Sequence, residues 1–250
     1  MLSGDKLLVD KINDLFNKCD KYCTPVFSSF LDEGELAVIE DRVFPPPGYN
    51  LKQFGGFEGA SRRIYGVFPE WQDAEAEEFP ISCVRITFKF GTKLNHRDYL
   101  GSILGLGLER YKTGDIIVLD DGAYVFVCDD VAEYIVSTLD KIGRRGVKCR
   151  LCKADEIELP PQEFEAIDCV AASPRLDAVI SAMLGISRKD SARLINEERV
   201  TVNHRLRTNM SKQIFEGDIL SVRGFGRFIF EKAGNNTRSG RIHIRVLKYV

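Results

Sequence analysis

A segment near the carboxyl end combines dense positive charge with the apolar spacing of a folded core. Residues 187–207 read SRKDSARLINEERVTVNHRLR, in which Leu, Ile and Val recur among the Lys, Arg and His residues. Apolar residues at regular intervals predict packing against other elements rather than a disordered tail. Any fold of this chain must therefore bury one side of the segment and leave its cations on the other side.

The net charge of the whole chain does not reveal that its carboxyl end is basic. The 250 residues carry a formal net charge of −2. Residues 174–250 contain 15 Lys or Arg against 7 Asp or Glu, whereas residues 1–173 contain 20 against 30. A basic end on an acidic body predicts that this end meets a polyanion.

Composition narrows the class of protein. A chain of this length is expected to form two domains, with room for a small third, at about 100–200 residues per domain. We expect a cytoplasmic protein without a membrane helix, because there is no apolar run of about 18 residues and no apolar signal core near the start. The seven cysteines are an odd number and predict reduced thiols rather than a disulfide framework.

Residues 1–75 predict a helical and mixed amino-terminal domain. Its first helix is expected over residues 5–23, where an apolar stripe at helical spacing is formed by Leu8, Ile12, Leu15, Phe16, Cys19 and Cys23. A second helix is expected over 33–41, and strands with a glycine turn within 51–71. An acidic loop, residues 72–80, leads to the next domain.

Residues 76–160 predict a ferredoxin-like domain, so the chain as a whole is expected to be α+β. The expected elements are a strand over 81–90, a helix opened by Asn95, two strands joined at Asp121-Gly122, a helix closed by Gly143, and a strand over 147–154. The resulting order β-α-β-β-α-β is that of ferredoxin-like domains and of the RNA-recognition motif.

Residues 174–250 predict a small α/β domain, reached through a connector over 157–174. Its first helix is expected over 175–185. Ser187 is expected to cap a second helix, with Asp190 three residues later as in a capping box. In that helix Ala192 and Ile195 should face inward, and Lys189, Arg193 and Asn196 should share another face. Strands are expected over 199–203, 217–224, 226–233 and 241–250, with a turn or loop over 234–240.

An ordered series of residues within 174–224 resembles the S-four domain, also called the alpha-L RNA-binding motif. The series comprises Arg175-Leu176-Asp177, Ser187-Arg188, Ala192, Ile195, Val200, Val202-Asn203, Gly217-Asp218 and Leu220. The family usually has glycine where this chain has Glu198 and His204. We expect positive φ at His204, which His tolerates better than most residues, whereas Glu198 places a negative charge near the expected RNA face.

Further blocks resemble the YlmH family across nearly the whole chain. They are FLDEGELAVIE, FGGFEGASRR, HRDYLGSILGLGLERYKTGDIIV and SVRGFGRF. The resemblance implies a ferredoxin-like middle domain and a carboxy-terminal S-four domain. It also implies RNA binding on ribosomes, with a role in the rescue of stalled translation on large subunits that hold peptidyl-tRNA.

The candidate site residues have chemistry that suits RNA. Double-stranded RNA is held through its phosphates and shallow minor groove, and arginine grips phosphate with two bonds. The candidates are Arg175, Ser187, Arg188, Lys189, Arg193, Asn196, Asn203, His204, Arg205, Arg207, Arg223, Phe225 and Arg227. Arg175 has the alternative of pairing with Asp177 at the helix start. Phe225 can either stack on an unpaired base, at about 1–3 kcal/mol, or pack onto its own domain.

Other motifs favour no catalytic, metal or cofactor site. His96-Arg97-Asp98 begins like a kinase catalytic loop, but Ile103 replaces the required asparagine. Arg110 replaces the third glycine of a dinucleotide fingerprint. Cys149 and Cys152, with Cys19 and Cys23, have zinc-ligand spacing, but positions three apart on a strand face opposite sides.

The middle domain leaves a second RNA surface open. Tyr124 and Phe126 alternate on one face of a strand, where they can either stack on bases or pack inside the domain. Arg85, Thr87 and Lys89 share a face of the first strand, and four further cations would help such a surface: Arg144, Arg145, Lys148 and Arg150.

Two functions remain in view. The first is a monomeric, non-enzymatic protein that binds ribosomal RNA on the large subunit, with tRNA as a further ligand. The alternative is the RNA-binding part of a pseudouridine synthase or methyltransferase. The position of the S-four-like segment at the carboxyl end, and the lack of a glycine-rich methyl-donor loop, favour the first function.

Overall fold

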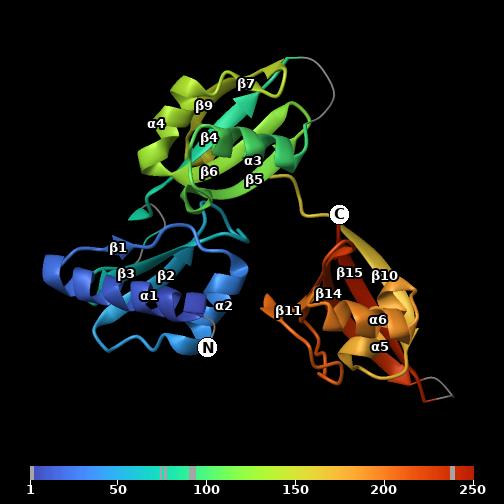
Figure 1. Ribbon diagram of the computed structural model, residues 1–250. Coiled ribbons are helices and arrows are strands. Elements are labelled where there is room, and N and C mark those ends of the chain that lie inside the picture. Colours follow the sequence, from blue (N-terminus) through green and yellow to red (C-terminus); the bar gives the residue numbers. More distant parts are fainter. Residues whose placement is uncertain (1–2, 74, 76–77, 90–93, 237–239) are drawn as a thin grey trace. The chain divides into compact units, whose positions relative to one another are not determined.

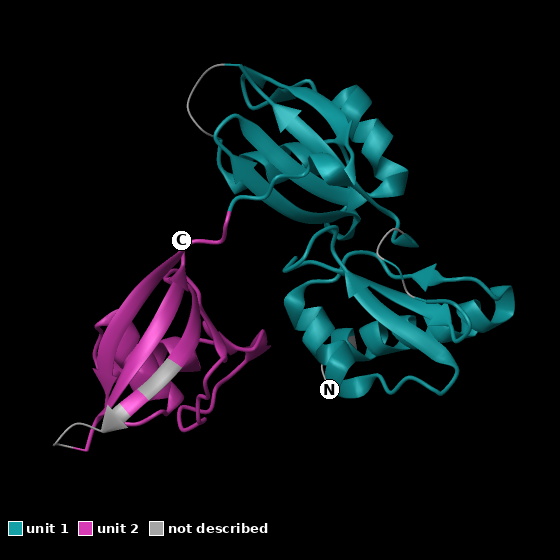
Figure 2. Cartoon of the chain, turned by 180° about the vertical axis from the view of Figure 1, so that it is seen from behind, with its two compact units in different colours: residues 1–160 teal, residues 161–250 magenta. Residues whose placement is uncertain are grey.

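The chain forms two compact units, Met1–Pro160 and Pro161–Val250 (Figures 1 and 2). The computed structural model describes residues 3–73, 75, 78–89, 94–236 and 240–250. Within these ranges no helix combines the length and apolar character needed to cross a bilayer. The expected acidic loop over 72–80 and the expected strand end at Phe90 fall partly outside the described residues.

The first part of unit 1 packs two helices on a three-stranded antiparallel sheet. The elements are α1 (Ser3–Tyr22), β1 (Val26–Phe27), α2 (Glu33–Arg42), β2 (Tyr49–Phe54) and β3 (Ile64–Pro69), with strand order β1-β3-β2. The predicted apolar stripe of α1 is buried at Ile12, Leu15, Phe16 and Cys19. The prediction that Cys23 completes this stripe is wrong, because the helix ends at Tyr22. Cys23 follows at φ 52 and is exposed to solvent.

The second part of unit 1 is the predicted ferredoxin-like domain. Its elements are β4 (Ile81–Thr87), α3 (His96–Gly105), a 3₁₀ turn (Arg110–Lys112), β5 (Thr113–Leu119), β6 (Gly122–Cys128), α4 (Asp129–Thr138), β7 (Lys141–Ile142), β8 (Arg145–Gly146), β9 (Lys148–Cys152) and a 3₁₀ turn (Ala154–Glu156). The antiparallel order β5-β6-β4-β9 is that of a split β-α-β fold. Helices α3 and α4 cover one face of this sheet (Figure 1).

The end of α4 differs from the prediction. Gly143 was expected to close this helix, but the helix stops at Thr138 because Leu139 turns to extended backbone and buries its side chain. Gly143 instead lies at φ 60 in the tight turn between β7 and β8. The amide of Val147 donates to the Asp140 carbonyl at 2.8 Å and closes this small hairpin.

The second face of the ferredoxin-like sheet is also covered. Tyr124 and Phe126 are 7% and 1% exposed, and the ring of Phe57 lies 4.8 Å from that of Phe126. The Tyr124 hydroxyl donates to the Glu156 carbonyl at 3.2 Å. These two rings therefore pack inside unit 1, and the stacking surface considered for them is wrong because the 55–57 loop and the segment after β9 occupy it.

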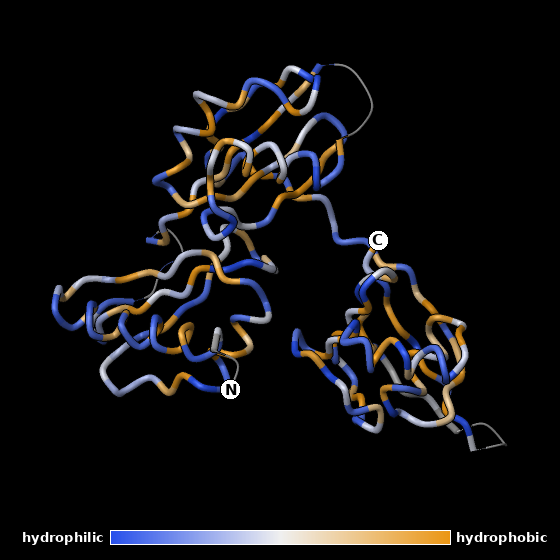
Figure 3. Tube along the Cα trace, in the orientation of Figure 1, coloured by the Kyte–Doolittle hydropathy of each residue, from blue (hydrophilic) through white to orange (hydrophobic). Residues whose placement is uncertain are grey.

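Unit 2 is built on a six-stranded antiparallel sheet. Its elements are β10 (Phe164–Ala171), α5 (Leu176–Leu184), α6 (Arg188–Asn196), β11 (Val200–Val202), β12 (Arg205–Leu206), β13 (Ile219–Val222), β14 (Gly226–Asn236) and β15 (Ile242–Tyr249). The order is β10-β15-β14-β13-β11-β12. Figure 3 shows the hydropathy of each residue along the chain, in which hydrophobic and hydrophilic residues interchange along these strands.

Two segments of unit 2 differ from the prediction. The expected connector contains strand β10, which pairs with β15 from Phe164↔Tyr249 to Ala171↔Ile242. Strand β14 continues to Asn236, into the expected turn over 234–240, whose residues 237–239 are outside the described part. Both strands pair with β15, so the sheet extends beyond the predicted domain start at 174. The predicted division of the first 160 residues at residue 75 stays a prediction.

The contact between Gly56 and Phe126 generates a stability prediction. A Cβ at Gly56 would lie 2.3 Å from a Phe126 ring carbon, whereas a Cβ at Gly59 would meet nothing within 4 Å. Both glycines have positive φ, 97 and 82. Gly59→Ala should lower the free energy of unfolding by about 1–2 kcal/mol through backbone strain alone. Gly56→Ala should cost about 1–3 kcal/mol more through overpacking.

Urea denaturation of the two variants measures this difference. Equal losses of stability for Gly56→Ala and Gly59→Ala would contradict the close approach of the loop to Phe126.

Candidate nucleic-acid interface

Helix α6 presents its cations on the side opposite to its buried side. Ser191, Leu194 and Ile195 are at most 4% exposed. The Ser191 hydroxyl donates to the Asp177 carbonyl at 2.8 Å and so joins α6 to α5. The solvent side of α6 carries the predicted site residues Arg188, Lys189, Arg193 and Asn196, all of them exposed. The buried residues of α6 are Ser191, Leu194 and Ile195, whereas Ala192, which was expected to face inward with Ile195, is half-buried.

The cations of α6 make only loose ion pairs. Arg193 lies 3.2 Å from Asp190 and 3.9 Å from Glu197, and its side chain is 66% exposed. Exposed pairs of this kind contribute about 0–1 kcal/mol, because solvent screens them. The guanidinium of Arg193 can therefore exchange its carboxylate partners for phosphate oxygens at little cost.

The start of α6 is capped as predicted, but without the full capping box. The Ser187 hydroxyl oxygen accepts from the Asp190 amide at 3.1 Å. The same hydroxyl donates to the Asp190 carboxylate at 2.7 Å, so that carboxylate bonds the cap side chain rather than the cap backbone. Both hydrogen bonds use Ser187 to fix the start of the helix.

Arg175 takes the alternative that the sequence offered. Its Nε donates to the Asp177 carboxylate at 3.1 Å, and the other oxygen of Asp177 lies 3.5 Å from Arg188. The Asp177 side chain is only 11% exposed. This carboxylate therefore hydrogen-bonds Arg175 and makes a longer, looser ion pair with the exposed Arg188.

Arg199, which the sequence analysis did not single out, joins α6 to the β13–β14 turn. Its guanidinium lies 3.5 Å from Glu197 and donates to the Arg223 carbonyl at 2.7 Å. Phe225 follows in that turn with 40% of its surface exposed, between glycines at positive φ. The predicted residues Arg193, Arg223 and Phe225 thus belong to one connected part of the surface. The density of cations in the segment 187–207 was the signal that could have identified Arg199.

The turn between β11 and β12 has the backbone that was expected. Asn203 and His204 adopt φ values of 49 and 62, and Glu198 before β11 adopts 56. The Asn203 amide group donates to the Asp218 carboxylate at 2.7 Å, and its oxygen accepts from the Ile219 amide at 2.8 Å. Asn203 therefore holds the turn together, and His204 lies at its tip.

A second group of predicted residues gathers around Arg227. Its guanidinium lies 3.4 Å from the His204 ring and 5.0 Å from the centroid of the Tyr249 ring. A cation over an aromatic face is held by the quadrupole of the ring. Arg205 extends from β12 opposite Val202, and the amide of Arg207 donates to the Val200 carbonyl.

Two cations of β15 are committed to the sheet. Arg245 makes two hydrogen bonds to Asp168, at 2.7 and 2.8 Å, which hold the pKa of that carboxyl below its usual value. Lys248 lies 3.2 Å from Glu165. Strand β10 therefore neutralises these two cations of β15.

The cysteine pair of β9 lies on a strand, as predicted. Cys149 donates to the Leu139 carbonyl at 3.3 Å, and burial raises its pKa to about 11. Cys152 belongs to the opposite face, across from Cys83. Among the described residues no group of three or more His, Cys, Asp or Glu side chains could hold a metal ion.

Two protein families match this chain, one in the ferredoxin-like domain and one in unit 2. Residues 74–156 match the family described as "Putative RNA-binding domain in YlmH", and residues 174–220 match the "S4 domain". The fold and the basic helix thus define a protein that joins a ferredoxin-like domain to an S-four domain.

Similarity to known relatives extends over most of the chain. The chain is 32% identical over 216 residues to "Ribosome-associated protein quality control protein P2" of Bacillus subtilis (strain 168), covering 86% of this chain and 83% of that protein. The chain belongs to the YlmH family, as its motifs predicted. A solved structure, "Cell division protein ylmH from Streptococcus pneumoniae", shares the fold with a TM-score of 0.53 at 20% identity, over 63% of this chain and 97% of that one.

The backbone at Glu198 generates a prediction. This residue is held at φ 56, whereas the neighbouring Glu197 lies at φ −77. Glu198→Gly should raise the free energy of unfolding by about 0.5 kcal/mol, because release of left-handed strain outweighs the entropy of glycine. Glu197→Gly should lower it by about 0.5–1 kcal/mol.

Thermal and urea unfolding of the two variants check the sign. A lower stability in both variants would show that Glu198 is not strained.

Proposed function

We propose that this chain is a non-enzymatic RNA-binding protein that acts on ribosomes in the cytoplasm. In this proposal the S-four domain of a single protomer clamps a stem of ribosomal RNA on the large subunit and can contact tRNA held there. The protein serves translation by acting on stalled ribosomes. The work is done by binding, so the chain needs no catalytic group or cofactor.

The exposed cations of α6 carry the proposal. Arg188, Lys189 and Arg193 lie on the side of a helix whose other side is fixed in the core, and the ion pairs of the two arginines are loose. RNA helices are recognised by shape through phosphates and the shallow minor groove, which a rigid row of cations can follow. The turn with Arg223 and Phe225 adds an arginine and an aromatic ring beside this row.

The comparisons support the ribosome as the place of action. The Bacillus subtilis relative is named as ribosome-associated and as a quality control protein. Both matched families are described by RNA-binding or S4 domains. These names concern the relatives, and they support the same partner for this chain because the similarity covers most of both proteins.

Reversal of the α6 charges tests the proposal. The triple variant Arg188→Glu, Lys189→Glu and Arg193→Glu should bind a labelled RNA stem-loop far more weakly at low salt. The slope of log affinity against log salt should fall by about one unit for each phosphate that the variant no longer neutralises. Fluorescence anisotropy over a salt series measures both quantities, and the difference between the proteins should shrink as salt rises.

A matched control separates a local contact from net charge. Lys6→Glu, Lys11→Glu and Lys21→Glu change the total charge equally on the exposed side of α1. This control should bind RNA like the wild type. Equal affinity of the folded α6 variant and the wild type at low salt would contradict the assignment of α6 as the RNA contact.

A further inference from the structure

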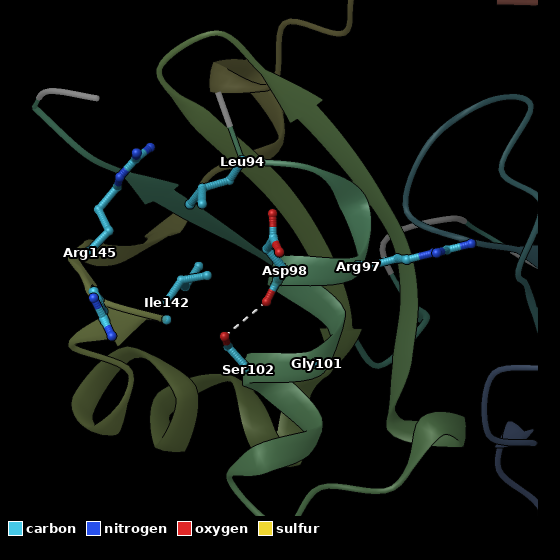
Figure 4. Close-up of a pocket in the computed structure, with 9 residues that line it drawn as sticks. Leu94, Arg97, Asp98, Gly101, Ser102, Ile142 and Arg145 are labelled. Atoms are coloured by element: carbon cyan, nitrogen blue, oxygen red, sulfur yellow. Dashed lines mark hydrogen bonds between the residues drawn. The ribbon is translucent and has the colours of Figure 1, made fainter. Parts of the chain in front are cut away.

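A hollow in the ferredoxin-like domain lies between α3 and the β7–β8 hairpin. Its volume is about 720 Å³, within the range of small-ligand sites. The helix side is lined by Asp98, Gly101 and Ser102, and the hairpin side by Arg144 and Arg145. In Figure 4, Arg145 stands across the hollow from Asp98 and Ser102, whereas Arg97 extends away from it. The hollow thus has an acidic and a hydroxyl side chain on one wall and two arginines on the other, and Leu94 and Ile142 also line it.

The charge around this hairpin is opposite to that of its unit. Unit 1 contains 20 Lys or Arg against 27 Asp or Glu. Residues 141–153 contain six Lys or Arg and no Asp or Glu. A concentrated basic segment in an acidic unit predicts a local contact with an anion rather than a broad attraction to polyanions.

The two arginines are placed to receive an anion at the rim. Arg144 is exposed at the turn of the hairpin, next to Gly143 at φ 60. The guanidinium of Arg145 lies 4.6 Å from the centroid of the Phe88 ring. Stacking on a ring restrains the long side chain, so the guanidinium gives up less conformational freedom when it binds an anion.

The polar groups on the helix side are already engaged at the start of α3. The Asp98 carboxylate accepts from the Asn95 amide at 2.8 Å. The amides of Arg97 and Asp98 donate to the Asn95 side chain. Since these first amides of α3 have partners, an anion in the hollow would depend on the hairpin arginines.

We propose that this hollow takes a phosphate of an RNA strand, held by Arg144 and Arg145. The proposal rests on the proposed function and adds a second contact point in the other unit. The sealed sheet face with Tyr124 and Phe126 removes the usual stacking surface of a ferredoxin-like RNA-binding domain, so RNA must use another surface of this domain, and the hairpin segment has the highest density of cations in it. An RNA strand fits better than a free nucleotide because the same hairpin carries a third exposed cation, Lys141, that can bind a neighbouring phosphate.

Filling the hollow and reversing its charge test the proposal separately. A Cβ at Gly101 would meet nothing within 4 Å, so Gly101→Gln should fill the space without disturbing the helix. The matched control is Gly105→Gln, on the same helix, where a Cβ also meets nothing and which does not line the hollow. Arg144→Glu with Arg145→Glu removes the cations, and Lys6→Glu with Lys11→Glu is its control for net charge.

Anisotropy of a fluorescein-labelled RNA stem-loop provides the readout in the full chain. Arg144→Glu with Arg145→Glu should weaken binding about tenfold at low salt and lower the salt slope by about two units. Gly101→Gln should weaken it by a smaller factor, and both controls should match the wild type. The same reductions in affinity should appear in the background of the α6 triple variant, where the residual affinity reports on unit 1.

Results other than these would contradict either the proposed function or the phosphate site. Absence of RNA binding by the wild type would overturn the proposed function and this inference together. Weakening by the α6 variant but not by the hairpin variants would overturn the inference alone. Weaker binding with the arginine pair reversed but not with Gly101→Gln would place the phosphate outside the hollow. Competition by AMP or inorganic phosphate for the part of the binding that needs Arg144 and Arg145 would show a small anion, rather than an RNA strand, as the ligand.

Discussion

A buried serine sets which side of α6 faces solvent. Ser191 is fully buried, and its hydroxyl donates to the Asp177 carbonyl across the contact between α5 and α6. A buried hydroxyl left without a partner would cost about 1–3 kcal/mol, so rotation of α6 about its axis is strongly disfavoured. The cations of α6 are displayed to solvent because the core holds the other side. The carboxylate of the same Asp177 lies 3.5 Å from Arg188, so this residue joins the two helices through its carbonyl and lies next to the basic surface.

In unit 1, by contrast, the ferredoxin-like sheet presents neither of its faces to solvent. The sheet is covered by α3 and α4 on one face and by the 55–57 loop and the segment after β9 on the other. Arg85 lies 5.2 Å from the centroid of the Tyr124 ring inside this second layer and pairs with Asp121. The sheet therefore serves as a core, and the exposed parts of the domain include its edge strand and its hairpin. The two units therefore differ in their basic surfaces. Unit 2 presents a basic helix, whereas unit 1, which is acidic as a whole, presents a short basic hairpin.

Sequence patterns predicted the features that depend on residues close together in the chain, namely helices, helix caps and a hairpin turn. Helical spacing identified α1, α5 and α6, Asn95 and Ser187 were recognised as caps, and Asp121-Gly122 identified the β5–β6 hairpin. Outside the ferredoxin-like domain, contacts between distant segments were missed. Strand β10 pairs with β15 across about 80 residues of sequence, and its exposed, proline-flanked segment resembled a connector. The cover of Phe126 by the 55–57 loop depends on a glycine about 70 residues away. The density of cations marked the segment that contains Arg199, but its partner is a backbone carbonyl, which side-chain patterns do not reveal.

Sedimentation with ribosomal subunits tests the central claim most directly. The wild type and the variant with Arg188, Lys189 and Arg193 reversed to Glu would be centrifuged with bacterial subunits through a sucrose gradient at low and moderate salt. The wild type should travel with the large subunit, and the variant should stay at the top of the gradient. Equal sedimentation of both proteins with the large subunit would contradict α6 as the ribosomal contact. Retention of both at the top, while free RNA is still bound, would contradict the ribosome as the place of action.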